Sequence, residues 1–171
     1  MVKSKKYFFL FLALLLPVVL FVFLKYFGEN EFSIPIYYEH STLGRESLCH
    51  ESISLPYAVP SESPVPIRGV SVLSFHDPNE QTLVQLNRVK NSFEGQVQVK
   101  SIIWGKDPFM DDQIILDSLT YAIAKCQFLI THDSTTVLID NERRIRGYYD
   151  GQSMKDMDRL IMEVKILLEK Y

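Results

Sequence analysis

An uncharged run from Tyr7 to Leu24 constrains this chain more than any other feature of its sequence. At about 1.5 Å per residue, a helix of that length spans about 27 Å, close to the ~30 Å hydrocarbon core of a bilayer. Pro17 lies within the run, and a membrane helix tolerates it with at most a kink. The sequence therefore predicts a transmembrane anchor at residues 7–27.

The charges on either side of this run are uneven. Lys3, Lys5 and Lys6 precede it, whereas Lys25 alone follows it, with two glutamates close behind. The positive-inside bias predicts that residues 1–6 form a cytoplasmic tail and that the rest of the chain lies outside the cytoplasm. A cleaved signal peptide is the alternative, but it would have a shorter apolar region and an A-x-A site, which the sequence lacks here. We expect an uncleaved single-pass anchor in the inner membrane and a periplasmic C-terminal domain.

The composition limits the partners and the class of scaffold. The formal net charge is −3 and no basic stripe is present, which argues against nucleic acid as a partner. Two cysteines, Cys49 and Cys126, could form one disulfide in an oxidising compartment, but they do not make a disulfide-rich scaffold. Their spacing does not show whether they pair.

Residues 28–66 have the composition of a linker. Five prolines punctuate the stretch, and the run SLPYAVPSESPVP favours an extended, polyproline-like chain. Short apolar runs such as residues 32–38 can still dock on a folded domain. We interpret residues 28–66 as a Pro-rich linker and residues 67–171 as the domain.

From residue 67 onward, strand-like and helix-like patterns alternate. β-Branched and apolar runs predict strands at residues 67–75, 97–104, 135–140 and 144–149. Apolar residues at steps of three and four predict helices at residues 80–93, from an Asp112 cap to Cys126, and from Ser153 to the C-terminus. Arg143, Arg144 and Arg146 make the last hairpin basic, and we interpret them as a solvated edge that blocks strand pairing.

The predicted order is β-α-β-α-β-β-α, which is the core of the thioredoxin fold, an α/β fold with a mixed sheet. Right-handed crossovers predict that the first three strands are parallel and that the hairpin adds an antiparallel edge. Function in such a sheet gathers at the carboxyl ends of the strands, here residues 75–79 and 131–134. A thioredoxin-type enzyme needs a C-x-x-C pair at the first loop, where a helix N-terminus lowers the thiol pKa. This sequence has FHDPN there, so we expect no dithiol exchange and no enzyme.

The run VLID at residues 137–140, followed by RIRGYYDG at residues 144–151 and an amphipathic helix, resembles the C-terminal hairpin of the Sco/SenC family. Those are membrane-anchored, thioredoxin-like proteins that deliver copper to cytochrome c oxidase or maintain its thiols. The anchor and the outward-facing domain are similar as well. The resemblance extends from about Thr131 to the C-terminus, roughly a quarter of the chain.

The family binds copper through a C-x-x-x-C pair and a distant histidine. The resemblance places the histidine at His132 and the cysteine positions near Phe75 and Asn79, so both cysteines are replaced. His76, Asp77 and His132 are then the candidate ligands of a replacement site. Two imidazoles and a carboxylate suit copper(II), zinc or non-haem iron better than copper(I). The alternative is that His76-Asp77 is polar turn chemistry and His132 is a relic of ancestry.

These observations predict a membrane-tethered, Sco-like module without copper or thiol chemistry. It would act as an accessory protein in respiratory oxidase biogenesis or in the cell envelope, with the oxidase or its assembly factors as partners. The competing hypothesis is an active metallochaperone or thiol-redox protein that uses His76, His132 and Cys126. Against a reactive role, Cys126 lies on the apolar face of its predicted helix, where a buried thiol behaves as a small hydrophobe. A third hypothesis is an envelope domain with an unrelated partner.

Overall fold

The computed structural model describes residues 2–27, 33–40, 54–75, 80–105, 112–132 and 135–170. The chain divides into two compact units, residues 1–33 and 34–171. The first contains helix α1 (Val2–Phe27), in which the segment Lys6–Tyr26 is long and apolar enough to cross a membrane. The structure therefore contains the helix that the sequence predicts as an anchor, by the criteria of length and composition.

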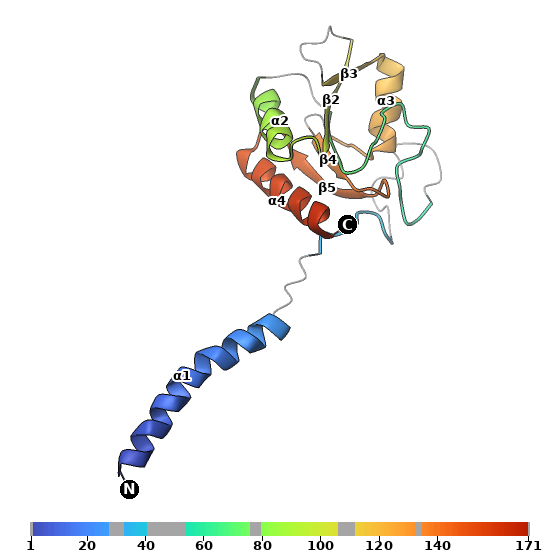
Figure 1. Cartoon of the computed structure of the whole chain (residues 1–171). Coiled ribbons are helices and arrows are strands. Elements are labelled where there is room, and N and C mark those ends of the chain that lie inside the picture. The colour runs from blue at the N-terminus through green and yellow to red at the C-terminus, as the bar shows by residue number, and fades with distance from the viewer. Residues whose placement is uncertain are drawn as a thin grey trace. The chain divides into compact units, whose positions relative to one another are not determined.

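The second unit is built on a five-stranded mixed sheet in the order β3-β2-β1-β4-β5 (Figure 1). The strands are β1 (Ser71–Phe75), β2 (Gln98–Trp104), β3 (Gln113–Leu116), β4 (Thr135–Ile139) and β5 (Ile145–Asp150). Strands β1, β2 and β3 are parallel, β4 is antiparallel to β1, and β5 is antiparallel to β4. The sheet and its helices make a thioredoxin-like α/β domain with one additional edge strand, β3.

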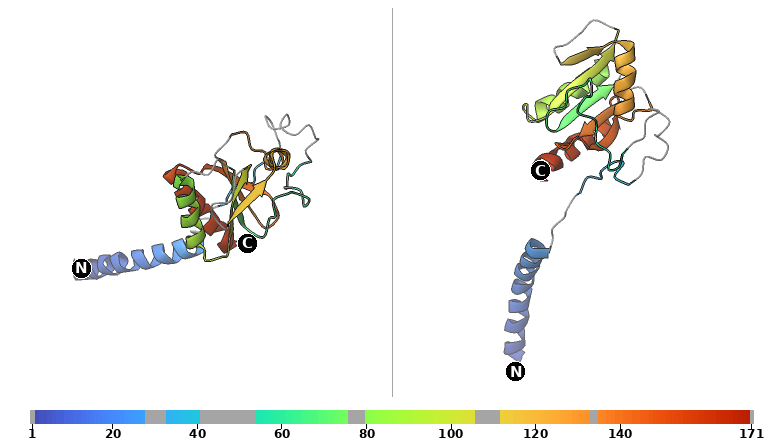
Figure 2. Two further views of the ribbon diagram at one scale, coloured as in Figure 1. Left: turned by 90° about the horizontal axis from the view of Figure 1, so that it is seen from above. Right: turned by 90° about the vertical axis from the view of Figure 1, so that its right-hand side faces the viewer.

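Helices cover both faces of this sheet. Helices α2 (Glu80–Ser92) and α4 (Met154–Lys170) lie on one face and α3 (Ser118–Gln127) lies on the other (Figures 1 and 2). Successive strand residues point to opposite faces, so Val72 packs with α2 and α4 whereas Leu73 packs with α3. The domain therefore has two apolar cores separated by the sheet.

The predicted parallel orientation of β4 is wrong. The segment that follows α3 contains the buried residues Phe128, Leu129 and Ile130, and β4 runs antiparallel to β1. The handedness rule for crossovers applies only to connections between parallel strands, so it does not determine the direction of β4. Because β4 is antiparallel, Phe75, the last residue of β1, pairs with Thr135, the first residue of β4.

The predicted start of the second helix is also wrong. Residues 113–116 form strand β3, and the carboxylate that caps α3 belongs to Asp117, which accepts hydrogen bonds from the N–H groups of Leu119 and Thr120 at 3.0 Å. Asp112 instead lies directly before β3. The apolar run of β3 also fits a helical period when it is joined to the residues of α3, so periodicity did not separate the two elements.

Parts of the predicted linker belong to the domain. Ile34, Val59 and Val65 are buried, and the second compact unit begins at Ile34, well before residue 67. The Tyr37 N–H donates to the Ile145 carbonyl, and the Val59 N–H donates to the Arg143 carbonyl, each at 2.9 Å. Residues 33–40 and 54–66 therefore pack against the last hairpin.

The interpretation of the hairpin arginines as a solvated edge is wrong, most clearly for Arg146, which is 2% exposed. Its guanidinium donates to the Asp140 carboxylate at 3.2 Å and to the Ile34 carbonyl at 2.7 Å. Arg144 donates to the same carboxylate at 2.9 Å, and Arg143 donates to the Val59 carbonyl at 2.7 Å. The hairpin is basic because it binds carbonyls of the N-terminal segments and the carboxylate of Asp140.

Candidate functional site

The edge of the sheet where β1 ends is the first candidate site. Because Phe75 pairs with Thr135, the loops that the sequence singled out leave and enter adjacent strands. His132 is exposed three residues before β4, and its main-chain carbonyl accepts a hydrogen bond from Thr135 Oγ1 at 2.8 Å. His76 and Asp77 lie outside the described residues, so their approach to His132 stays a prediction. Within the described ranges, no group of three His, Cys, Asp or Glu side chains is arranged to hold a metal ion.

Phe75 occupies the position that the resemblance assigns to one of the two cysteines. Its side chain is fully buried, and its ring lies 5.2 Å from the ring of Phe128 and 6.0 Å from that of Tyr121. Asn79, at the second cysteine position, lies outside the described residues. The first of the two positions therefore holds a core aromatic ring in place of a reactive group.

Cys126 is half-buried near the end of α3 and is disulfide-bonded. It is consequently neither the small buried hydrophobe nor the free reactive thiol that the sequence left as alternatives. Cys49, the only other cysteine in the sequence, lies outside the described residues.

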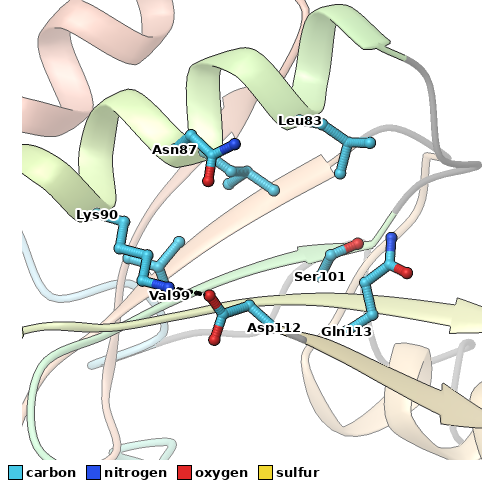
Figure 3. Close-up of a pocket in the computed structure, with 8 residues that line it drawn as sticks. Leu83, Asn87, Lys90, Val99, Ser101, Asp112 and Gln113 are labelled. Atoms are coloured by element: carbon cyan, nitrogen blue, oxygen red, sulfur yellow. Dashed lines mark hydrogen bonds and ion pairs between the residues drawn. The ribbon is translucent and has the colours of Figure 1, made fainter. Parts of the chain in front are cut away.

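A pocket between α2 and strands β2 and β3 is a second candidate site (Figure 3). Its cavity volume is about 20 Å³, room for about one water molecule, and it is partly open to solvent. Helix α2 and the two strands supply its lining residues: Leu83, Leu86, Asn87, Lys90, Val99, Ser101, Asp112 and Gln113. Sequence reasoning missed this pocket, because its residues follow no motif. The one available signal was Ser101, a hydroxyl within the apolar strand β2.

The pocket combines a paired carboxylate with an unpaired hydroxyl. Hydrogen bonds to Asp112 from Lys90 and from Lys100, the latter at 3.0 Å, lower the pKa of the Asp112 carboxyl. Ser101 is only 3% exposed, and its Oγ has no hydrogen-bond partner in the structure as described. Leaving a buried hydroxyl unpaired costs about 1–3 kcal/mol, so a polar group bound in the pocket would gain from pairing with it.

Replacing Asp112 with asparagine is expected to remove a small, pH-dependent part of the stability. Because the folded-state pKa is lowered, the contribution is present above the unfolded pKa of about 3.9 and is lost as pH falls through the folded value. The Asp112 side chain is 37% exposed, so we expect the loss at pH 7 to stay below about 1 kcal/mol. Urea unfolding at pH 7 and at pH 2 measures it.

The exposed Glu169 provides the matched control as Glu169→Gln, because no ion pair to it is found among the described residues. This variant is expected to unfold like the wild type at both pH values. If Asp112→Asn lowers the free energy of unfolding equally at pH 2 and pH 7, the carboxylate charge is not the cause of the loss.

Comparison with known proteins finds similarity at the level of fold. No family model matches the chain, and no curated protein matches it. One similar solved structure is a solution structure from Bacteroides thetaiotaomicron, described as a candidate protein disulfide isomerase, with 12% identity over 60% of this chain and 75% of that chain, at a TM-score of 0.46. Another is BsSco, a member of the Sco family of cytochrome c oxidase assembly proteins, with 12% identity over 60% of this chain and 82% of that chain, at a TM-score of 0.43. The strand order of the chain itself carries the fold assignment.

Proposed function

We propose that this protein is a membrane-tethered, thioredoxin-like binding module without copper or thiol chemistry of its own, which serves as an accessory factor in respiratory oxidase biogenesis at the cell envelope. The observation that carries the proposal is the buried ring of Phe75 at the carboxyl end of β1. The protein is then not an enzyme, and it acts through its surfaces.

The chemistry of the site supports the absence of redox activity. Dithiol exchange requires a thiolate at a helix N-terminus or beside a positive charge, and Phe75 supplies none at the end of β1. Cys126 is already disulfide-bonded and lies near the C-terminal end of α3. The oxidase link rests on the resemblance of residues 137–140 and 144–151 to the Sco/SenC hairpin.

The proposed location is the inner membrane, with a cytoplasmic N-terminus and a periplasmic domain. The excess of lysines before the anchor supports this orientation. The disulfide at Cys126 supports it independently, because disulfides persist in oxidising compartments and are rare in the cytosol. Confinement to one membrane raises the effective concentration of a weak binding module near a membrane-bound partner.

Thiol trapping and copper titration of the full chain in detergent test the proposal. We expect no thiol to be labelled before reduction and no stoichiometric binding of copper(II) at micromolar concentration. Co-purification with oxidase subunits is expected from the membrane of the source cell, and its absence would favour an unrelated envelope partner.

The alternative function, a metallochaperone that uses His76, His132 and Cys126, would need the disulfide of Cys126 to be reduced first. It is retained for one reason: the pairing of Phe75 with Thr135 brings the ends of the two loops together. It predicts one copper(II) ion per chain that is lost in His132→Ala. The exposed His40, on the N-terminal segment, serves as the control as His40→Ala. Copper binding lost in the first variant and kept in the second would replace our proposal with this alternative.

A further inference from the structure

The pocket between α2 and strands β2 and β3 is small, and part of its lining is polar (Figure 3). Its volume of about 20 Å³ accommodates one water molecule, which needs at least about 10–15 Å³, but not a side chain of a partner. An apolar cavity of this size stays dry, whereas a polar cavity holds water when about two to four polar groups surround it. The polar groups of the lining therefore decide what the pocket binds.

Three uncharged polar side chains line this pocket, and each comes from a different element. Ser101 and Gln113 are paired across β2 and β3, so their side chains point to the same face of the sheet. Asn87 reaches toward them from α2 (Figure 3). A hydroxyl and two amides can each donate and accept hydrogen bonds. Together they provide the number of partners that a buried water molecule usually has.

Ser101 differs from the other buried serines of the sheet in the partner of its hydroxyl group. The Ser74 hydroxyl hydrogen-bonds with Thr136 Oγ1 at 2.9 Å, and the Ser71 hydroxyl donates to the Gly69 carbonyl at 3.1 Å. Ser101 is only 3% exposed, and no protein group among the described residues pairs with its Oγ. The chain therefore supplies partners for two of these serines, whereas the hydroxyl of the third lies at the pocket.

The charged residues beside the pocket favour a neutral occupant. The Asp112 carboxylate accepts hydrogen bonds from Lys90 and Lys100, which lower the pKa of its carboxyl, so it is ionised at neutral pH. This carboxylate would repel a bound anion, and the two ammonium groups would repel a bound cation. A water molecule carries no net charge, and it can donate and accept hydrogen bonds at the same time.

We propose that this pocket is the binding site of one resident water molecule, which pairs with the Ser101 hydroxyl and bridges it to the amides of Asn87 and Gln113. The water then links α2 to β2 and to the edge strand β3. This inference does not depend on the proposed function, but it narrows it. Because the pocket holds a structural water, it does not receive a side chain of a partner, and the binding module uses another surface.

A high-resolution crystal structure of the full chain, grown with bromide as the only halide, tests the proposal. We expect a density peak about 2.6–3.0 Å from Ser101 Oγ, the distance of a hydrogen bond between oxygens, without the anomalous signal of bromide. The peak should persist in Ser71→Ala, whose hydroxyl has a protein partner. It should disappear in Ser101→Val, because the added methyl groups fill the space and cannot form a hydrogen bond.

Thermal unfolding of the full chain in detergent provides a second test. If a water molecule pairs with the Ser101 hydroxyl, Ser101→Ala removes a satisfied hydrogen bond, and its midpoint should fall by about 2–4 °C. If the hydroxyl is unpaired, Ser101→Ala should raise the midpoint, because a buried hydroxyl without a partner destabilises the fold. Ser71→Ala is the matched control, because it removes a buried hydroxyl that is known to be paired.

Three results in the crystal would each overturn the proposal: no density at the site, an anomalous bromide peak, or a protein group bonded to the Ser101 hydroxyl. A midpoint of Ser101→Ala above that of the wild type would overturn it as well. Neither the wild-type density nor the Ser101→Ala midpoint depends on whether Ser101→Val folds. The copper and thiol measurements test the proposed function separately, so its failure and the failure of this inference are distinguishable.

Discussion

Replacing Asp140 with asparagine is expected to lower the free energy of unfolding by about 3–5 kcal/mol, the usual cost of breaking a buried ion pair from one side. The carboxylate of Asp140 binds the guanidinium groups of Arg144 and Arg146, and its other oxygen accepts the N–H groups of Glu142 and Arg144 at 2.9 Å. Asparagine preserves the shape and the turn, so the loss isolates the charge left on buried Arg146. Denaturant unfolding followed by the fluorescence of Trp104, the single tryptophan, measures it.

Glu142 provides the control, because it also pairs with Arg144 but its side chain is 64% exposed. Glu142→Gln should cost less than about 1 kcal/mol, as surface ion pairs do. Adding Arg146→Met to Asp140→Asn should recover part of the loss, since the uncompensated charge is then gone. If Asp140→Asn lowers the free energy of unfolding no more than Glu142→Gln does, the ion pairs of Asp140 with Arg144 and Arg146 do not stabilise the hairpin.

Reduction of the disulfide at Cys126 is expected to be the second large effect. Cys49 is the only other cysteine of the chain, and an intrachain bond to it closes a loop of about 80 residues, for which the expected stabilisation is about 2–4 kcal/mol. The closed loop restricts the unfolded chain, and reduction releases that restriction. Unfolding of the full chain with and without a reducing agent measures the difference.

The cysteine variants provide the control for reduction. Cys49→Ser and Cys126→Ser should each reproduce the loss, and the reducing agent should then have no further effect on either variant. A covalent dimer on non-reducing gels would show instead that Cys126 bonds to another chain, and the stability argument would not apply.

Most of the regular elements were predictable because their apolar residues repeat with one clear period. Strand β1 begins four residues after its predicted start, helix α2 ends one residue before its predicted end, and α4 follows the apolar stripe that predicted it. Strand β3 was missed because a four-residue apolar run fits either period. The antiparallel direction of β4 was missed because strand direction depends on which elements meet in space, and local sequence patterns do not encode that.

The candidate site was less predictable than the fold. The sequence pattern predicts a strand that ends in Phe75. The disulfide at Cys126 and the pocket at Ser101 could not be predicted, because they depend on which elements meet in space. The residues that carry the Sco/SenC resemblance also have structural roles. A Cβ on Gly147 would collide with the ring and hydroxyl of Tyr149, and one on Gly151 would lie 2.9 Å from the Thr82 methyl carbon. Close packing at these glycines explains a similar hairpin without implying a similar reaction.

The burial of Ile34, Val59 and Val65 also sets the limits of the smallest autonomous folding unit of this chain. A recombinant fragment that begins at residue 67 contains every strand and helix of the sheet, yet it deprives Arg146 of the Ile34 carbonyl and Arg143 of the Val59 carbonyl. It also removes the extended segment that hydrogen-bonds to the edge strand β5. A soluble version for crystallisation or biophysics should therefore begin near Ser33, because residues 33–40 and 54–66 of the predicted linker pack as part of the domain.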